Sequence, residues 1–336
     1  MSKLYTPAGW VDMEYVESIP ATYIFIFGGR GIGKTYGMQE RIDHAHRGEA
    51  MILRRTKTEW DIVTDDRMNM FSAYNQDHGT AYHFEKENGI ATIKDGEDYA
   101  GISAPLSTFS NLRGFDNFSH INIMYYDEFI PERHKAKIRD EHNVFLNVYE
   151  SINRNRELKG RDPVKCICMA NSNDIKNPLF LGLNLVSMAE KMKRKEKEIQ
   201  IDNKRGVALV DCCYSPISQK KAETALYRMA GDGEFFNMAI KNNFNNPLLP
   251  SVSRKLIEYR PVCAAGEIYV YRHKSNGMYY VSATRHTAPL YQASDTGLEI
   301  FRMQHAYLYD AFFAGKIEFE SNIMQLLFLT YFKILS

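Results

Sequence analysis

The sequence predicts an α/β domain with a mainly parallel sheet, followed by a small helical linker and a C-terminal α+β domain. Three observations lead to this prediction. Apolar strands alternate with helical segments up to about residue 200, which is typical of a parallel sheet covered on both faces. A glycine-rich loop at 28–35 follows the first strand directly. A second hairpin pattern then begins after residue 250, and 336 residues are enough for about two domains.

The elements of the first domain follow from local patterns. Residues 22–27 (TYIFIF) form a continuous apolar run, typical of a central strand buried on both faces. Asn88-Gly89 is the dipeptide that a two-residue hairpin turn prefers. The remaining elements expected here are a helix at 34–46, a strand at 50–54, a helical region at 59–74, a hairpin at 81–93, a strand at 121–127, a helix at 143–153 and a strand at 164–170.

The alternating pattern is expected to end near residue 200. Residues 188–205 hold seven basic and four acidic residues, which favours a solvated face or a linker. The later elements are a polar helical region at 216–243, a proline-containing break at 246–250, a hairpin at 267–285, and helices at 297–314 and 321–335. We therefore expect one domain at 1–205, a linker module at 206–240 and a second domain at 241–336.

Composition excludes several classes of protein. The 42 basic and 41 acidic residues give a net charge of +1, which argues against a partner chosen by bulk charge. Residues 236–336 carry 10 basic and 7 acidic residues, or +3, which leaves −2 for residues 1–235. The 44% hydrophobic content is too high for a disordered chain. The 12% aromatic content leaves stacking on nucleic-acid bases possible.

Neither zinc nor a membrane is expected. The five cysteines (166, 168, 212, 213 and 263) lack the C-x2-C spacing of a zinc site, and their odd number suits reduced thiols. The most apolar stretch, at 323–335, is shorter than the roughly 20 residues that a membrane span needs. No secretory signal opens the sequence. We expect a soluble intracellular protein.

The glycine-rich loop satisfies the pattern G-x-x-x-x-G-K-[ST]. Its glycines let backbone N–H groups curl around phosphate oxygens, and the following helix directs its N-terminal dipole at the same anion. The lysine reaches the β- and γ-phosphates, and the threonine hydroxyl binds Mg²⁺. The predicted nucleotide site consists of Gly28, Gly29, Arg30, Gly31, Ile32, Gly33, Lys34 and Thr35.

Two acids end the strand at 121–127. Asp127 is expected to hold Mg²⁺, through water. Glu128 is expected to activate the attacking water. A kinase or GTPase rarely needs the second acid, whereas an ATP-hydrolysing motor does. This pair, 93 residues after Lys34, predicts a P-loop ATPase of the ASCE type.

Two further positions carry alternative interpretations. Asn171, after the strand at 164–170, could contact the γ-phosphate or the lytic water as a sensor, or could simply form a turn. Arg154 and Arg156 follow the helix at 143–153. They could supply an arginine finger to a neighbouring subunit, or form a surface cluster that favours a helix C-terminus.

With these motifs in place, the chain resembles the DNA-packaging ATPases (encapsidation proteins) of φ29-like tailed bacteriophages. The resemblance is strong over residues 20–190, and beyond them it rests on length and arrangement. The runs that carry it are GGRGIGKTYGM (28–38), LRRTKTEW (53–60), SAPLS (103–107), YYDEFI (125–130), RNRE (154–157), CICMANS (166–172) and NPLFLGLNLV (177–186).

This resemblance implies a homo-oligomeric ring, pentameric in the family, that works in the host cytoplasm on the portal vertex of an empty prohead. It implies ATP-driven pumping of double-stranded viral DNA, a packaging RNA as a further partner, Mg²⁺ as cofactor, no membrane, and absence from the mature virion.

The resemblance also assigns residues. Lys34, Thr35, Asp127 and Glu128 match the nucleotide and catalytic positions. Arg154 matches the arginine supplied in trans, with Arg156 as the alternative. Lys57 matches a basic residue that faces the DNA channel. Arg113 is a further candidate for contacting nucleic acid and for acting across the subunit interface.

For the second domain the resemblance implies an RNase H-like nuclease fold that has lost its chemistry. A two-metal nuclease needs several carboxylates on adjacent strands. The hairpin strands at 268–273 and 278–285 contain no acid. We therefore expect binding of nucleic acid, either the packaging RNA or the entering DNA, without cleavage.

Two other functions remain to be weighed. A terminase-type nuclease or helicase is disfavoured by the missing acidic cluster. An assembly factor that binds ATP without turnover is disfavoured by the intact Asp127-Glu128 pair.

Overall fold

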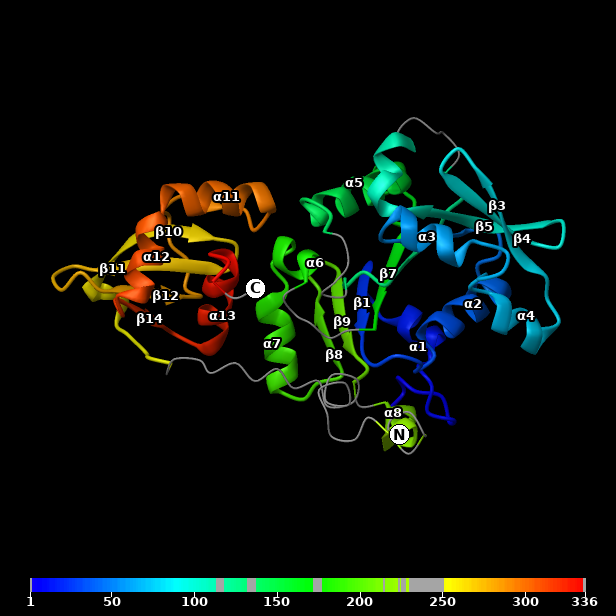
Figure 1. Cartoon of the computed structure of the whole chain (residues 1–336), viewed down its shortest axis with the longest axis horizontal. Coiled ribbons are helices and arrows are strands. Elements are labelled where there is room, and N and C mark those ends of the chain that lie inside the picture. The colour runs from blue at the N-terminus through cyan, green and yellow to red at the C-terminus, as the bar shows by residue number, and fades with distance from the viewer. Residues whose placement is uncertain are drawn as a thin grey trace. The chain divides into compact units, whose positions relative to one another are not determined.

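The computed structural model describes residues 2–112, 118–131, 137–171, 177–213, 215–222, 224, 228–229 and 251–334. The chain forms two compact units (Figure 1). The first contains residues 1–138, 144–173 and 196–243, and the second contains residues 139–143, 174–195 and 244–336. Arg113, one of the predicted interface residues, lies outside the residues that the structure describes.

The first unit is built on a nine-stranded sheet with the order β3-β4-β5-β2-β6-β7-β1-β9-β8. All neighbours from β5 to β9 in this order are parallel, and β3, β4 and β8 pair antiparallel at the two edges. The strands are β1 (Tyr23–Phe27), β2 (Ala50–Arg54), β3 (Tyr82–Glu87), β4 (Ile90–Asp95), β5 (Asp98–Pro105), β6 (Ile123–Asp127), β7 (Lys165–Ala170), β8 (Ile199–Asp202) and β9 (Val207–Asp211). The predicted mainly parallel α/β domain is confirmed.

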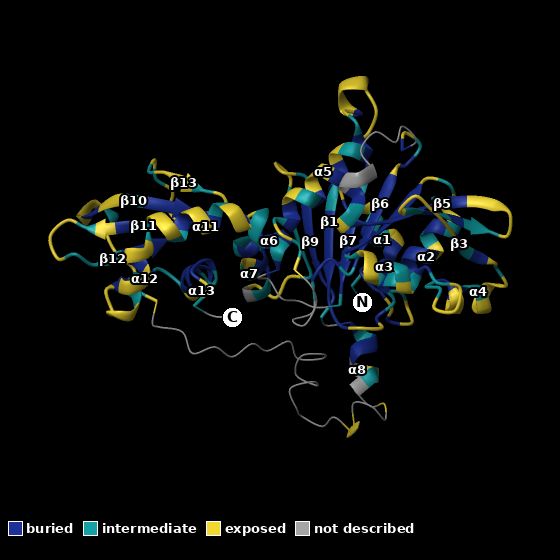
Figure 2. Cartoon of the chain, turned by 45° about the horizontal axis from the view of Figure 1, so that its top comes forward, coloured by how far each residue is buried: buried dark blue, intermediate teal, exposed yellow. Residues whose placement is uncertain are grey.

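Helices cover both faces of this sheet. Strands β1, β6, β7 and β9 are buried almost throughout, as their dark blue colour in Figure 2 shows. One face packs on apolar residues of α1 and α2 such as Met13 and Met38. On the other, Phe145 stacks on Tyr126. The helical elements are α1 (Met13–Ser18), α2 (Lys34–His44), α3 (Lys57–Val63), α4 (Ser72–His78), α5 (Glu141–Asn153), α8 (Pro216–Ala222) and the 3₁₀ helices Leu106–Leu112 and Glu157–Lys159.

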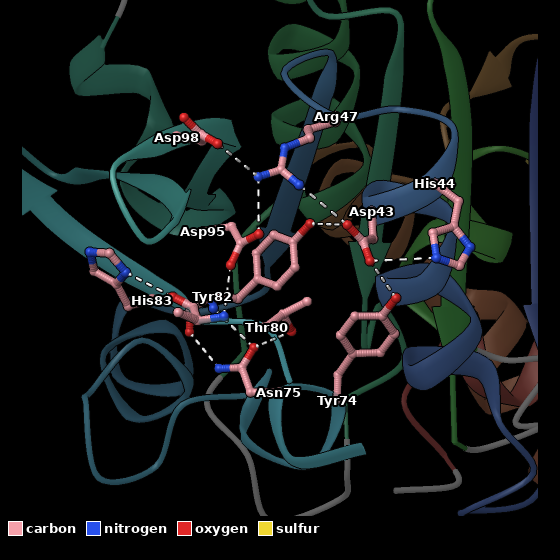
Figure 3. Close-up of polar contacts among 11 residues, drawn as sticks. Asp43, His44, Arg47, Tyr74, Asn75, Thr80, Tyr82, His83, Asp95 and Asp98 are labelled. Atoms are coloured by element: carbon pink, nitrogen blue, oxygen red, sulfur yellow. Dashed lines mark hydrogen bonds and ion pairs between the residues drawn. The ribbon is translucent and has the colours of Figure 1, made fainter. Parts of the chain in front are cut away.

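A polar cluster attaches the β3–β4 hairpin to the far end of α2 (Figure 3). The carboxylate of Asp43 accepts hydrogen bonds from the hydroxyls of Tyr82, at 2.7 Å, and Tyr74, at 2.8 Å. Burial alone raises the pKa of Asp43, but these two bonds, together with neighbouring His44 and Arg47, outweigh it and lower the pKa below its ordinary value. Arg47 donates to Asp95 on β4 at 3.0 Å. Helix α2 therefore runs from the glycine-rich loop to a fixed contact with the hairpin.

The first unit differs from the sequence-based prediction in three places. The helical region at 59–74 is two helices, α3 and α4. Strand β5 was not expected. It lies so close to β2 that a Cβ on Gly101 would be 2.7 Å from the Ala50 carbonyl oxygen, so the strand needs a glycine that weakens its apolar pattern.

The expected boundary after residue 205 also differs from the structure. Strand β9 pairs with β1 along its whole length, and β8 pairs with β9. Residues 206–211 are thus part of the first sheet and not of a linker, because the charge-rich stretch before them conceals a strand pair. Within the expected linker the structure describes α8, and residues 230–240 lie outside the described part of the chain.

The second unit contains a five-stranded sheet with the order β13-β10-β11-β12-β14. The three central strands are antiparallel, and β13 and β14 join the two edges in parallel. The hairpin expected at 267–285 is β11–β12, and the helix expected at 297–314 is two helices that meet at His305. The elements are α6 (Pro178–Gly182), α7 (Val186–Arg194), 3₁₀ helix Leu256–Glu258, β10 (Tyr259–Ala265), β11 (Ile268–His273), β12 (Tyr279–Ser282), β13 (Leu290–Tyr291), α11 (Asp295–Gln304), α12 (Ala306–Phe313), β14 (Ile317–Phe319) and α13 (Asn322–Tyr331).

Helix α13 contacts β11, β12 and β14, and Figure 2 shows it largely buried. Side-chain caps define the starts of two helices. Ser294 accepts a hydrogen bond from Gly297 N at the start of α11, and Ser321 accepts one from Met324 N at the start of α13. The C-terminal α+β domain is confirmed as a fold class.

Of the helices that the structure describes, none combines the length and the apolar character that crossing a membrane requires.

Candidate nucleotide-binding site

The glycine-rich loop connects the end of β1 to the start of α2. Gly31 and Gly33 have φ values of +63° and +95°, a left-handed conformation that favours glycine. Gly33 is the N-cap of α2, so the helix begins directly at Lys34. Val11 N donates to Ile32 O at 2.9 Å, which ties the N-terminal segment to the loop. Two of the loop glycines thus stand where the backbone is left-handed.

The Lys34 ammonium folds back onto the loop. Its Nζ donates to the carbonyl oxygens of Gly29, at 2.8 Å, and Gly28, at 3.2 Å. The side chain is buried, and burial lowers the pKa of Lys34 to about 8. Asp127 opposes this shift, and Lys221 adds to it. A buried cation whose partners are neutral carbonyls favours binding of an anion.

Thr35 and Asp127 meet beside the loop. Thr35 Oγ1 lies 3.5 Å from Asp127 Oδ1. Asp127 is 4% exposed, and burial raises its pKa while neighbouring Arg54 limits the rise. Hydroxyl and carboxylate oxygens are the ligands that Mg²⁺ prefers. The donor set therefore fits the predicted Mg²⁺ site.

Arg54 is a site residue that the sequence analysis missed. It ends β2 at the position that pairs with Asp127 on β6. Its guanidinium donates to Asp127 Oδ2 at 2.6 Å and to Glu128 Oε2 at 2.8 Å. Burial disfavours the charged guanidinium, but the two carboxylates outweigh it and raise the pKa of Arg54. The sequence feature that could have identified Arg54 is its position at the carboxyl end of the strand predicted at 50–54.

Glu128 is held from two sides. It has φ +58°, an uncommon conformation for a residue other than glycine, which costs about 1–3 kcal/mol and clusters at functional sites. Its Oε2 accepts from Arg54, and its Oε1 accepts from Asn171 Nδ2 at 3.1 Å. The structure thus brings together Glu128 and Asn171, which the sequence analysis singled out separately.

The two candidate arginines differ in environment. Arg156 is 4% exposed and donates to Asn122 Oδ1 and Ser119 O, each at 2.8 Å, and also to Ile121 O. These bonds fix its guanidinium inside its own subunit, which disfavours Arg156 as a finger. Arg154 is partly exposed, has φ +45°, and donates through Nε to Ser151 O at 3.2 Å.

Lys57, the predicted DNA-facing residue, is the first residue of α3. Thr56 and Glu59 form a capping box that fixes this helix start. The Lys57 side chain is 56% exposed, and its Nζ lies 2.9 Å from Asp61 Oδ2.

Glu267 and Glu320 of the second unit take part in separate local contacts. Glu267 accepts hydrogen bonds from Val186 N and Ser187 N, each at 3.1 Å, and so caps α7. Glu320 accepts from Ser282 Oγ and Ala283 N. Within the described ranges, no group of three or more His, Cys, Asp or Glu side chains could hold a metal ion.

Known proteins resemble this chain in sequence. The chain is 29% identical over 227 residues to the DNA packaging proteins of Bacillus phages PZA and phi29, an alignment that covers 66% of this chain and 61% of each relative. The matched segment thus spans about three fifths of these relatives' length.

Solved structures share the fold. A chain of the bacteriophage Phi-29 viral genome packaging motor assembly matches with a TM-score of 0.62 and 19% identity, over 96% of this chain and 98% of that one. The Phi-28 gp11 DNA packaging motor matches with a TM-score of 0.59 and 16% identity, over 98% and 99%. The family model of the Podovirus DNA encapsidation protein (Gp16) matches residues 11–285, so this chain belongs to that family.

Proposed function

We propose that this protein is an ATP-hydrolysing motor that moves double-stranded viral DNA through the portal into the prohead. The observation that carries the proposal is the convergence of Lys34, Thr35, Asp127 and Glu128 at one edge of the sheet. Membership of a DNA encapsidation family supports the choice of DNA as the moved substrate.

Different site residues would contact the phosphates and the Mg²⁺ ion of ATP. Backbone N–H groups of the loop and the α2 N-terminus would cradle the phosphates. Lys34 would exchange the loop carbonyls for phosphate oxygens. Thr35 and Asp127 would hold Mg²⁺, which when bound neutralises phosphate charge.

Glu128 is the proposed general base for the attacking water. In the structure its two oxygens are engaged by Arg54 and Asn171. Each carboxylate oxygen has a second lone pair, so the attacking water can bind to Glu128 beside these two donors. Asn171 would then be placed to orient the same water, which is the sensor role rather than the turn role.

Arg154 is the proposed finger. Its partial exposure supports a contact outside its own subunit, where a guanidinium would stabilise charge that develops in the transition state. This requires a homo-oligomeric ring, and we propose the pentamer that the family resemblance implies. Mixtures of Glu128→Gln and Arg154→Ala subunits should regain part of the ATPase activity if Arg154 acts in trans, and none if it acts in cis.

The second unit is proposed to contact nucleic acid, either the DNA or a packaging RNA. Arg260 and Arg272 are exposed and stand directly opposite each other on β10 and β11. Like charges in this position repel, which an anionic partner would relieve. The Arg272 guanidinium lies 5.8 Å from the Tyr279 ring centroid, so a cation and an aromatic ring are presented together.

Replacing Arg260 and Arg272 together by glutamine should weaken DNA or RNA binding alike for all sequences. Loss of two phosphate contacts should also lower the slope of log affinity against log salt by about 2. An unchanged slope would remove this surface from the proposal.

We propose that the protein does not cleave DNA, because the acids of the second unit are dispersed and two of them, Glu267 and Glu320, are occupied in structural bonds. The alternative function, a terminase-type nuclease, would require DNA cleavage. A plasmid incubated with the protein and Mg²⁺ or Mn²⁺ should stay uncut. Cleavage that disappears in Glu267→Gln or Asp295→Asn would overturn this part.

The main test is packaging itself. Purified protein, proheads and viral DNA should yield DNase-protected DNA only with hydrolysable ATP, and Glu128→Gln should abolish both protection and hydrolysis. An assembly factor without turnover would instead support prohead attachment with no ATP consumed. The same preparations, imaged on proheads by electron microscopy, give the subunit number and the place of action.

A further inference from the structure

The last turn of α8 lies against the glycine-rich loop. Lys221 Nζ donates to the carbonyl oxygen of Arg30 at 2.7 Å. A Cβ added to Gly31 would lie only 2.2 Å from the same Nζ, so the ammonium occupies the space beside the loop that a side chain at 31 would need. A second lysine therefore lies at the middle of the loop, on a helix distant in sequence.

The placement of α8 is fixed by the elements that also fix the loop. Strand β9 runs beside β1, and Cys212 N, just after β9, donates to Phe27 O at 2.8 Å. Ser215 Oγ donates to Gly9 O at 3.0 Å, and Ile217 is buried in the core. Lys221 thus reaches the loop from a helix whose start is anchored beside the carboxyl ends of β1 and β9.

The ammonium of Lys221 is bonded to a neutral partner. Among the residues that the structure describes, no carboxylate lies within ion-pair distance of its ammonium, whereas Lys57 has Asp61. Burial lowers the pKa of Lys221, and Lys221 in turn lowers the pKa of Lys34. Two ammonium groups therefore approach one loop, each bonded to neutral carbonyl oxygens.

Lys221 and Lys34 bind the loop in the same way, through carbonyl oxygens. The Lys34 ammonium rests on the carbonyls of Gly28 and Gly29, and the Lys221 ammonium rests on the next carbonyl along, that of Arg30. A polyanion in the loop would give both groups a charged acceptor in place of a neutral one, and charge-assisted bonds are about twice as strong.

We propose that Lys221 is a second cationic ligand of the nucleotide phosphates, supplied by the same subunit as Lys34. The assignment rests on the proposed ATP binding. When nucleotide enters, Lys221 Nζ leaves the Arg30 carbonyl and bonds a phosphate oxygen.

The test is equilibrium binding of Mg-ATP to the full-length protein by calorimetry. Lys221→Met should weaken ATP binding about tenfold, the loss expected for one charge-assisted bond. Lys220→Met is the matched control, because Lys220 is the exposed neighbour on the same helix, and it should change affinity less than twofold. Lys221→Arg keeps the charge and should restore most of the affinity.

Salt and thermal measurements separate ligation from a structural role. A phosphate ligand predicts that the affinity of Lys221→Met depends less on ionic strength than that of the wild type, since one screened charge is gone. If Lys221→Met binds ATP as the wild type does, with or without a lowered melting temperature, Lys221 only fastens α8 and the proposal is overturned.

The outcome for Lys34→Met distinguishes this failure from that of the proposed function. If the wild type binds ATP and Lys34→Met does not, an unaffected Lys221→Met variant removes only the Lys221 assignment. If the wild type binds no ATP, or Lys34→Met binds as well as the wild type, the proposed function itself fails, and the Lys221 assignment falls with it.

Discussion

The two units use carboxylates in opposite ways. In the first, Asp127 and Glu128 converge with Arg54 at the carboxyl edge of a parallel sheet, where the Arg54 guanidinium donates to both carboxylates. In the second, Glu267 caps a helix and Glu318 pairs with Arg254 at the surface. Topology brings Arg54 to the two neighbouring acids of the first unit, because the carboxyl ends of the parallel strands β2 and β6 meet at one edge.

The largest effect expected from this contrast is on turnover. Glu128→Gln should keep nucleotide affinity but lower the rate of ATP hydrolysis about 10³-fold, because a positioned general base contributes about 10²–10⁴. Glu267→Gln is the matched change in the second unit and should leave the rate unchanged. A Glu128→Gln rate within tenfold of the wild type would show that the gathered acids are not catalytic.

The next effect is on stability. Arg54→Met leaves the two carboxylates, one of them buried, without their hydrogen-bonded cation, and should lower the free energy of unfolding by about 3 kcal/mol. Denaturant titration measures this. Arg254→Met removes an exposed pair in the second unit and should move the midpoint little. Equal shifts in the two variants would contradict the contrast between the units.

The third effect depends on pH. Lys34 has a pKa of about 8 in the folded protein against an ordinary 10.5, so the unfolded chain holds more protons between these values. Its contribution makes stability rise with pH across that window. ATP affinity should fall over the same range, by about tenfold per pH unit once Lys34 is neutral. Calorimetry from pH 7 to 9.5 measures this, and Lys34→Arg should flatten the profile.

The smallest effect concerns the cap of α7. Glu267→Gln weakens the acceptor at the Val186 and Ser187 N–H groups and should destabilise the second unit by about 1 kcal/mol. Hydrogen exchange of the α7 amides should rise in this variant and stay unchanged at α2. Faster exchange in α2 as well would indicate that the effect is not local.

Much of the first unit was predictable because its strands are short apolar runs and its loop has a specific pattern. Thr35 near Asp127 follows from that pattern. Arg54 could not be assigned, because its role depends on β2 lying next to β6, and the sequence does not state strand order. Lys221 was equally hidden, since β9 before it was assigned to a linker.

The second unit was less predictable for a different reason. Its edge strands β13 and β14 are only two and three residues long, too short for a pattern to be recognised. The helix expected at 297–314 divides at His305, where the continuous apolar spacing gives no sign of the break.

Helix α2 is a rigid rod of 11 residues, about 16 Å long, with the glycine-rich loop at one end and the Asp43 cluster at the other (Figure 3). Since both ends are fastened, a tilt of α2 on phosphate binding would also move the β3–β4 hairpin. The tip of this hairpin would then move as well. The emission of a fluorescent label at exposed Asn88 should therefore change when nucleotide binds.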